Sequence, residues 1–453
     1  MPSLHLARLD IVTLGTGAGI ALALSVLALH AALLPEAHWQ GDDFICAAFA
    51  RDGHLRYLWE ARIGSWSPRP LSELIFYLYG RVAAALLRPL TVPFLALLWG
   101  VLVATTLVTL RRDRTAPLRI LVGLATACLF LLGHPVAEMF FWPAGAVAYL
   151  STLAATSLAL FLVADGRDAS LSGMLALSAS LTACAASSEA GAIAAVPLAL
   201  VLAATSPHPR RLALPPVPLL VAGFVLWTLA HHRMVSTEAV GHAAPLRHLA
   251  ESLRPVPRAL LDDMLPIWPA RLCLVFGLRW CWTLGGWPAP ARYTLPAVAG
   301  ALLLAAAVTI AAGLFQFGTP CCQRHDSLRQ CWVVLALAAM AIWSARWPAR
   351  PALARLGPAA LCLACLLGVS PRLHAIAGDF RLMHAIVAGN AANWHAGRDT
   401  AGRSMLFRLP PAAALAGPIQ IPAGRYDEPA LNSWTAHGLM HFFGKSRITI
   451  QPP

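Results

Sequence analysis

Long apolar runs recur along the whole sequence, and they constrain the fold of this chain more than any other feature. A membrane-spanning helix needs about 20 predominantly apolar residues, and eleven stretches qualify as candidates. Of the 453 residues, 58% are hydrophobic and 12% are charged, against about 25% charged in a typical soluble domain. A soluble fold of this size could not bury so much apolar surface. We therefore predict an all-α polytopic membrane protein and exclude a single soluble domain, a disordered chain and a β-barrel of alternating strands.

Loops that are polar or rich in proline separate the expected spans. The span near Leu265 is the least regular, because Arg271 and Arg279 interrupt it. The segment Leu71–Leu87 mixes apolar and charged residues, which favours an interfacial amphipathic helix inside a first outer loop over 35–91. The eleven spans are expected at Ile11–Leu34, Val92–Leu110, Leu118–Gly133, Gly145–Val163, Leu171–Ala186, Gly191–Ala204, Leu214–Ala230, Leu265–Thr283, Leu295–Leu314, Trp332–Trp343 and Ala359–Val369.

Arginine supplies nearly all of the basic charge and indicates an orientation. The net charge is +13, and Lys445 is the single lysine among 34 basic residues. Short cytoplasmic loops carry an excess of basic residues. With eleven spans, the arginine-rich short loops all fall on one side of the membrane, which is therefore predicted to be cytoplasmic. The N-terminus is expected on that same side. Residues 1–369 then form the transmembrane domain, and residues 370–453 form a small extracytoplasmic tail. No basic block interleaved with aromatics is present, so no nucleic-acid partner is expected. The loop arginines are Arg111, Arg112, Arg114, Arg119, Arg210, Arg211, Arg346, Arg350 and Arg355.

Polar residues that could carry chemistry gather near the predicted outer ends of the spans. Asp42 and Asp43 follow the first span in the sequence Gly-Asp-Asp-Phe. Adjacent carboxylates suit a base, a divalent-cation ligand or a sugar-hydroxyl acceptor, and the plain alternative is a solvated turn. Arg69 lies between two prolines at head-group depth. It suits binding of a lipid phosphate through its planar donor fork, or a role as a snorkelling anchor.

Four more residues complete the candidate set. Trp142 and Tyr149 belong to an aromatic run that leads into the fourth span, where they suit stacking on a sugar or an ordinary interfacial belt. Glu189 lies in the short break between the fifth and sixth spans, too near the membrane for an ordinary surface carboxylate. Arg324 follows a polar loop before the tenth span.

These motifs, in this order, resemble the GT-C superfamily of membrane glycosyltransferases, and most closely an uncharacterised bacterial branch distantly similar to the protein mannosyltransferases. The resemblance spans nearly the whole chain. The chain departs from the pattern at Ser188 and Ala190, where amides usually flank the glutamate, and at Ala148, where asparagine is usual. The motifs are Gly-Asp-Asp-Phe at 41–44, Arg-Pro-Leu at 69–71, Phe-Trp-Pro-Ala-Gly-Ala-Val-Ala-Tyr-Leu at 141–150, Ser-Ser-Glu-Ala-Gly at 187–191, Pro-x-x-x-Arg at 320–324, and a tail stretch over 432–444.

The resemblance implies sugar transfer from a polyprenyl-phosphate donor to an extracytoplasmic glycan, lipid or protein acceptor, at the bacterial inner membrane. Asp42 or Asp43, with Asp42 favoured, would act as the base, and a divalent cation at this pair is the one cofactor considered. The other site residues would bind the donor and share one outer cavity, partly roofed by the tail: Arg69, Trp142, Tyr149, Glu189 and Arg324.

Two other classes of protein remain open. A non-catalytic envelope assembly protein would bind glycolipid without transferring sugar, and the three departures from the motifs favour it. A lipid flippase or transporter would show ionisable residues near mid-span and an internal repeat, whereas here the candidate polar residues gather on one outer face and no repeat is visible.

Overall fold

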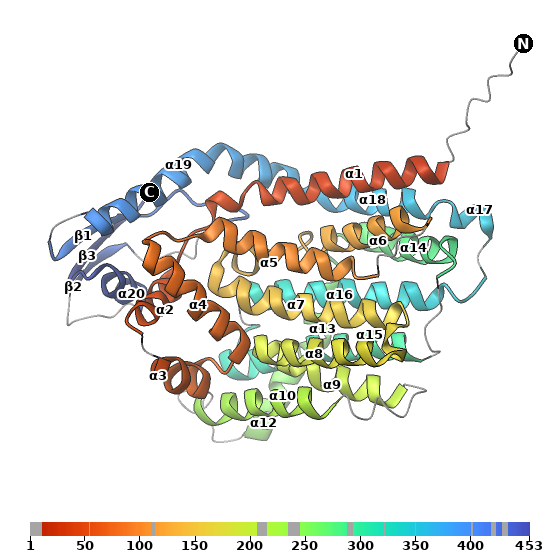
Figure 1. The fold of residues 1–453 in the computed structure, drawn as a ribbon, viewed down its shortest axis with the longest axis horizontal. Coiled ribbons are helices and arrows are strands. Elements are labelled where there is room, and N and C mark those ends of the chain that lie inside the picture. Colours follow the sequence, from red (N-terminus) through yellow and green to blue (C-terminus); the bar gives the residue numbers. More distant parts are fainter. Residues whose placement is uncertain are drawn as a thin grey trace, which may run out of the picture.

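The computed structural model describes residues 11–453 except residue 54 and residues 110–113, 206–214, 234–244, 288–292, 321, 349, 400–401, 418–422 and 428–433. Most helices run nearly parallel in one bundle, and short helices with a small sheet cover one of its ends (Figure 1). We refer to this end, which carries α2, α4 and α20, as the site end. Several residues used in the sequence analysis lie outside the described part of the chain: Arg111, Arg112, Arg210 and Arg211 of the arginine pattern, and residues 432–433 of the tail motif.

Each predicted apolar segment falls on a helix, because a helix satisfies its own backbone hydrogen bonds in apolar surroundings. In the described part of the chain, five helical stretches are long and apolar enough to cross a membrane: Val12–Glu36, Pro143–Ala164, Thr294–Phe317, Gln323–Ser344 and Gly357–Arg398. The bundle helices are α1 (Ile11–Ala31), α5 (Thr91–Thr106), α6 (Ala116–Leu129), α7 (Pro143–Ala164), α8 (Leu171–Ser187), α9 (Glu189–Thr205), α10 (Pro216–Thr228), α14 (Trp268–Leu284), α15 (Thr294–Phe317), α16 (Gln323–Ser344) and α18 (Gly357–Val369).

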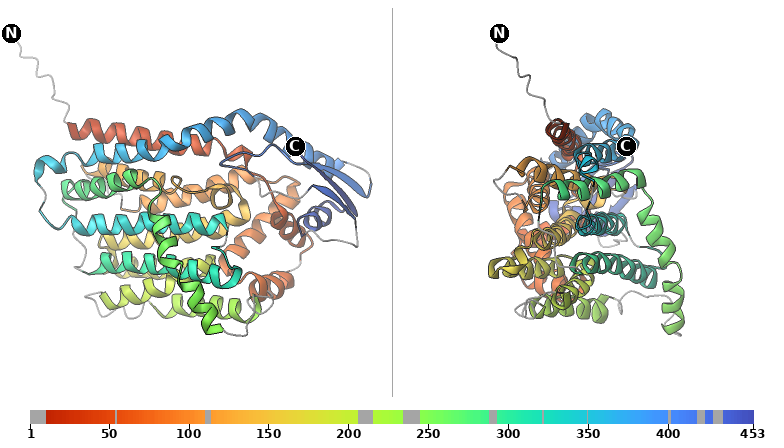
Figure 2. Two further views of the ribbon diagram at one scale, coloured as in Figure 1. Left: turned by 180° about the vertical axis from the view of Figure 1, so that it is seen from behind. Right: turned by 90° about the vertical axis from the view of Figure 1, so that its right-hand side faces the viewer.

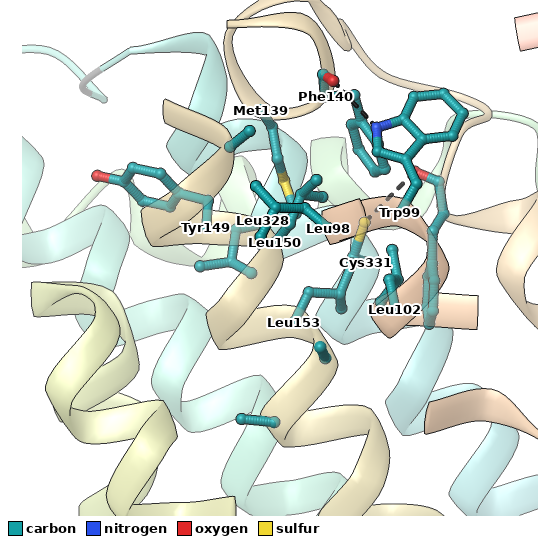
Figure 3. Close-up of a cluster of buried hydrophobic side chains, with 14 of the residues drawn as sticks. Leu98, Trp99, Leu102, Met139, Phe140, Tyr149, Leu150, Leu153, Leu328 and Cys331 are labelled. Carbon is teal, nitrogen blue, oxygen red and sulfur yellow. Dashed lines mark hydrogen bonds between the residues drawn. The ribbon is translucent and has the colours of Figure 1, made fainter. Parts of the chain in front are cut away.

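Helix α7 lies at the centre of the bundle, where α5, α8 and α16 pack around it. Its start is fixed by a buried cluster that includes Trp99 of α5, Phe140 and Leu150 (Figure 3). The Trp99 indole also donates a hydrogen bond to the Phe140 carbonyl at 3.0 Å. Buried aromatic side chains contribute large apolar areas, so this cluster holds the entry of the chain into α7.

The irregular segment near Leu265 forms helix α14, and its first arginine is accommodated inside the protein. Arg271 is buried and donates to the Asp263 carbonyl at 2.6 Å and to the Gln330 side chain at 3.1 Å. A charged side chain within an apolar helix is costly unless polar partners receive it. The arginine that weakened the sequence pattern is therefore bound by neighbouring elements.

The predicted interfacial segment forms helix α4 (Pro70–Leu86), within a first loop that also contains α2 (Gly41–Arg51), α3 (Leu55–Tyr57) and η2 (Leu58–Trp66). One face of α4 packs against α2, α7 and α8. The opposite face exposes a stripe of apolar side chains at intervals of four residues, namely Leu74, Leu78, Val82 and Leu86. This amphipathic pattern suits a helix at a boundary between protein and an apolar medium. On another side of the bundle, α12 (Pro245–Leu253) and α13 (Val256–Met264) form a separate arm (Figure 2).

The tail contains a sheet, so the all-α prediction is wrong for this part of the chain. After α19 (Leu373–Asp399) come β1 (Ser404–Arg408), β2 (Gly424–Asp427), α20 (Trp434–Phe443) and β3 (Arg447–Gln451). The strand order is β1-β3-β2, with β3 parallel to β1 and antiparallel to β2. Both β1 and β3 alternate exposed with buried residues, which is the two-residue period of a half-buried strand.

Candidate functional site

A cavity of about 610 Å³ lies at the site end of the bundle. Its walls come from α2, η2, α4, α7 and the start of α16, which are far apart in the sequence. Its size falls within the range of about 300–1,000 Å³ that is usual for small-molecule sites. Five of the residues singled out from the sequence line this one cavity: Asp42, Arg69, Trp142, Tyr149 and Arg324.

Glu189 does not line this cavity directly. It lines a smaller adjoining cavity of about 50 Å³, whose walls share Arg69, Tyr149 and Arg324 with the larger one. Its two carboxylate oxygens accept from Nε and Nη2 of Arg69 at 2.7 and 2.9 Å. Bidentate pairs of this kind fix the plane of the guanidinium. Glu189 therefore orients Arg69, whereas the resemblance implied that it binds the donor directly.

Two further arginines of the large cavity pair with carboxylates, Arg62 through two hydrogen bonds and Arg324 through one side-chain hydrogen bond. Arg324 donates to Glu138 at 3.0 Å, and Arg62 donates to both oxygens of Glu73 at 3.0 and 2.8 Å. The sequence analysis did not single out Arg62. Its position shortly before Arg69 in the same outer loop was the one feature of the sequence that could have indicated a role for Arg62 at the site. A guanidinium has five N–H donors, so each of these arginines keeps donors beyond those its carboxylate accepts.

The two adjacent aspartates have different surroundings. Asp42 lines the cavity, whereas Asp43 is 1% exposed and accepts three hydrogen bonds. Its Oδ2 accepts from the Gln40 amide at 2.7 Å and the Trp142 indole at 2.6 Å, and its Oδ1 accepts from the Ala144 amide at 3.2 Å. Asp43 thus ties the start of α2 to the start of α7.

A divalent cation shared by Asp42 and Asp43 fits this arrangement poorly. Both lone pairs of Asp43 Oδ2 face N–H donors, and Oδ1 has one lone pair left. Within the described ranges, no group of three or more His, Cys, Asp or Glu residues could hold a metal ion. Of the two adjacent aspartates, Asp42 is the one that lines the cavity.

Aromatic rings and guanidinium groups alternate along one wall of the cavity. The Tyr149 ring centre lies 5.7 Å from the Arg69 guanidinium carbon and 5.9 Å from that of Arg324. The Tyr149 hydroxyl is 2.6 Å from His325 Nε2. Figure 3 shows Tyr149 extending away from the buried cluster that fixes α7. The centre of the Trp142 ring lies 5.4 Å from the guanidinium carbon of Arg324. This wall suits a ligand that combines a polar ring with an anionic group.

The positions that depart from the family motifs lie on or beside the cavity walls. Ala148 lines the large cavity and Ala190 lines the small one. The Ser188 hydroxyl makes two hydrogen bonds. It lies 2.7 Å from the Thr152 hydroxyl and accepts from the Gly191 amide at 2.9 Å. It caps the first turn of α9, which begins at Glu189. The serine thus preserves the geometry of the turn, whereas Ala148 and Ala190 contribute no side-chain hydrogen-bonding group to the cavity walls.

The described residues of the tail do not line the cavity, contrary to the expectation that the tail partly roofs it. None of the cavity-lining residues in the described part of the chain comes after residue 369. Helix α20 packs against α2 instead. In the described part of the tail, α20 thus contacts the helix that carries Asp42.

Comparisons with protein-family models, with curated proteins and with solved structures returned no match for this chain. The geometry of the cavity and its chemistry therefore carry the functional argument.

We expect the stability of the wild-type chain, relative to Asp43→Asn, to fall as the pH rises from about 4 to about 8. Burial raises the pKa of Asp43 from 3.8 to about 8, so the folded chain keeps a proton there that the unfolded chain releases. Stability from this proton is complete below the unfolded pKa and is lost as the pH rises through the folded one. Each unit of difference between the folded and unfolded pKa corresponds to about 1.4 kcal/mol in the free energy of unfolding. Thermal unfolding of both chains in detergent at pH 5 and pH 8 measures the change, and a difference independent of pH contradicts it.

Proposed function

We propose that this protein transfers a sugar from a polyprenyl-phosphate donor to a hydroxyl acceptor at the site end of the bundle, on the extracytoplasmic side of the bacterial inner membrane. One observation carries the proposal: a carboxylate that lines the cavity shares its walls with three arginines and with aromatic rings. Sugar transfer needs this combination. A base takes the acceptor proton, and cations stabilise the departing phosphate.

The proposed reaction assigns one role to each part of the cavity. Asp42 accepts the hydroxyl proton while the acceptor oxygen bonds to the anomeric carbon. The bond between that carbon and the phosphate oxygen breaks, and polyprenyl phosphate leaves with the electron pair. Arg69 and Arg324 bind this phosphate, and Trp142 provides a surface for the sugar ring. Tyr149, which is 0% exposed, supports this wall by packing against Arg69 and Arg324.

An apolar groove offers a place for the donor's hydrocarbon chain. It measures about 580 Å³ and lies between α12, α13 and α15, with walls that include Leu249, Val256 and Phe315. Ala312 lines both this groove and the small cavity, and Arg69 and Arg324 line both the small and the large cavity. An isoprenoid chain in the groove would therefore bring its phosphate to the two arginines, which supports a lipid-linked donor.

Sugar transfer by the purified full-length chain tests the proposal. The chain is reconstituted in lipid nanodiscs and given polyprenyl-phosphate-linked sugars together with a mixture of candidate glycan, lipid and peptide acceptors. The expected result is release of polyprenyl phosphate that depends on an acceptor. Tight donor binding without release in any combination would favour the non-catalytic glycolipid-binding alternative. Movement of intact lipid between the leaflets of a vesicle would favour a flippase.

We expect an N-terminus inside and eleven spans, which place residues 35–70 and the tail outside. The reason is the arginine excess of alternate short loops. Single cysteines introduced at Glu60 and Ser446, in a background without reactive native thiols, should react with an impermeant maleimide added to intact spheroplasts. A cysteine at Arg350 should react only after the membrane is permeabilised. A tail that reacts only after permeabilisation contradicts the odd number of spans.

A further inference from the structure

Helix α20 of the tail and helix α2 of the first outer loop approach each other closely at two glycines. A Cβ atom added to Gly438 would lie 2.7 Å from the carbonyl oxygen of Gly41. One added to Gly41 would lie 2.8 Å from the Cα of Thr435. Both contacts involve backbone atoms, so no side-chain rotation relieves them. A methyl group at either glycine must move one helix relative to the other.

The two helices also contact each other along the rest of their length. Arg51, at the end of α2, donates to the Phe442 carbonyl at 2.6 Å. Between the two ends lies an aromatic cluster of Trp39, Phe44, Trp394 and Phe442, with ring centres 5.2–5.9 Å apart. Such pairs contribute about 0.5–1.5 kcal/mol each beyond their area. The close approach at the glycines is therefore enforced along the whole of α2.

The contact lies directly beside the proposed base. Asp42 follows Gly41 in the chain, and Asp43 fixes the other side of this turn to Trp142 and the start of α7. The first turn of α2 is thus held between α7 and α20. No described tail residue lines the cavity, and the position of this turn is the shortest route by which α20 can affect the reaction.

We propose that the Gly41–Gly438 contact makes α20 a positioning element, which sets where the Asp42 carboxylate lies in the cavity although the tail does not touch the substrate. This proposal rests on the proposed function. A displacement of about 1 Å in a reacting group can cost about 10²-fold in rate. A single methyl group at residue 438 is a perturbation of that size, because ordinary contacts between non-bonded heavy atoms lie near 3.5–4.0 Å.

The test compares Gly438→Ala and Gly438→Val with the matched control Gly378→Ala. Gly378 lies in α19 of the same tail, and a Cβ there meets nothing within 4 Å. We expect the alanine at 438 to lower kcat by about 10²-fold with an unchanged KM for the donor, and the valine to lower it further. The control should keep the wild-type values. Size-exclusion chromatography establishes that each full-length variant is folded and monodisperse.

A second measurement separates this proposal from the proposed function. Asp42→Cys is made in the wild-type chain and in Gly438→Ala, Gly438→Val and Gly378→Ala. Mass spectrometry follows the rate at which this cysteine reacts with a small methanethiosulfonate, relative to the rate in the wild-type chain. We expect the residue-438 variants to change this rate at least threefold and the control to leave it unchanged, whether or not sugar transfer is detected. An altered labelling rate, together with no sugar transfer by the wild-type chain that keeps Asp42, would refute the proposed reaction and leave the positional coupling standing. Unchanged reactivity and transfer in Gly438→Ala, or failure of that variant to fold, would overturn the positioning role in favour of a purely structural contact.

Discussion

Replacing Asp42 by Asn should lower the rate of sugar transfer by about 10²–10⁴-fold, the usual effect of losing a general base. The substitution keeps the size of the side chain and removes its ability to accept a proton. Binding of the donor should survive, because Arg69 and Arg324 and their glutamate partners are untouched. Initial rates and donor affinity of the purified variant, measured side by side, separate these two effects.

The matched control is Glu60→Gln in the same outer loop. Glu60 is exposed and pairs with Arg56 in an exposed ion pair, so its loss should leave both rate and affinity unchanged. The Asp42 and Asp43 variants should also differ from each other, because Asp43 holds three N–H donors and does not line the cavity. Wild-type transfer by Asp42→Asn would remove this carboxylate from the chemistry and leave the glycolipid-binding alternative ahead.

The positions of the bundle helices were predictable because the signal for an apolar helix is local. About 20 apolar residues in a row determine helix formation wherever they occur. The difficult segment shows the limit of this rule. Arg271 weakened the apolar pattern, and the sequence could not reveal that Asp263 and Gln330 receive its donors. Partners from other helices are a property of the packed bundle.

The sheet in the tail was missed because its strands are short and their pattern is weak. In β1, Met405 and Phe407 are buried between exposed neighbours, and in β3 Ile448 and Ile450 are buried on either side of the half-buried Thr449. Two buried apolar residues per strand do not register in a window suited to membrane helices. The partner strands β1 and β3 are also separated by β2 and α20, so no local hairpin signal joins them.

Most of the candidate site could be found by residue type and by position at span ends, but the role of each residue could not. The residue types and spacing do not distinguish Asp42 from Asp43, and the preference for Asp42 came from the resemblance alone. The structure distinguishes them, because successive residues of a helix point in directions about 100° apart. One side chain then lines the cavity, and the other meets the start of α7. Likewise, the resemblance placed Glu189 among the donor-binding residues, whereas the structure pairs it with Arg69.

Each cavity arginine has its own carboxylate, which has a consequence for donor recognition. The pairs Arg69–Glu189, Arg324–Glu138 and Arg62–Glu73 leave the paired groups close to neutral in total charge. The cavity therefore cannot attract a phosphate by net charge alone. It offers instead guanidinium groups held in fixed planes, and preorganised donors of this kind suit charge that develops as the phosphate departs.

Removing one partner of the Arg69–Glu189 pair should therefore affect both stability and binding, in separable ways. Glu189→Leu leaves the guanidinium in a largely buried place without its carboxylate, with side-chain exposure of 15% for Arg69 and 9% for Glu189. Breaking a buried pair costs about 3–5 kcal/mol, whereas replacing both partners by apolar groups is often neutral. We expect Glu189→Leu to lower the thermal stability strongly, and Arg69→Met/Glu189→Leu to recover most of it.

Donor affinity distinguishes a binding role from a structural one in the same set of variants. The double variant should fold yet bind the polyprenyl-phosphate donor at least tenfold more weakly, because it lacks one of the two guanidinium groups proposed to hold the phosphate. The control is Glu60→Ala, whose exposed i,i+4 pair with Arg56 should be worth only about 0.3–0.5 kcal/mol. Wild-type donor affinity in the stable double variant would show that the pair only joins α4 to α9 and would restrict phosphate binding to Arg324 and Arg62. A double variant as unstable as Glu189→Leu alone would mean that the pair is itself the source of stability, since the apolar replacement would then fail to substitute for it.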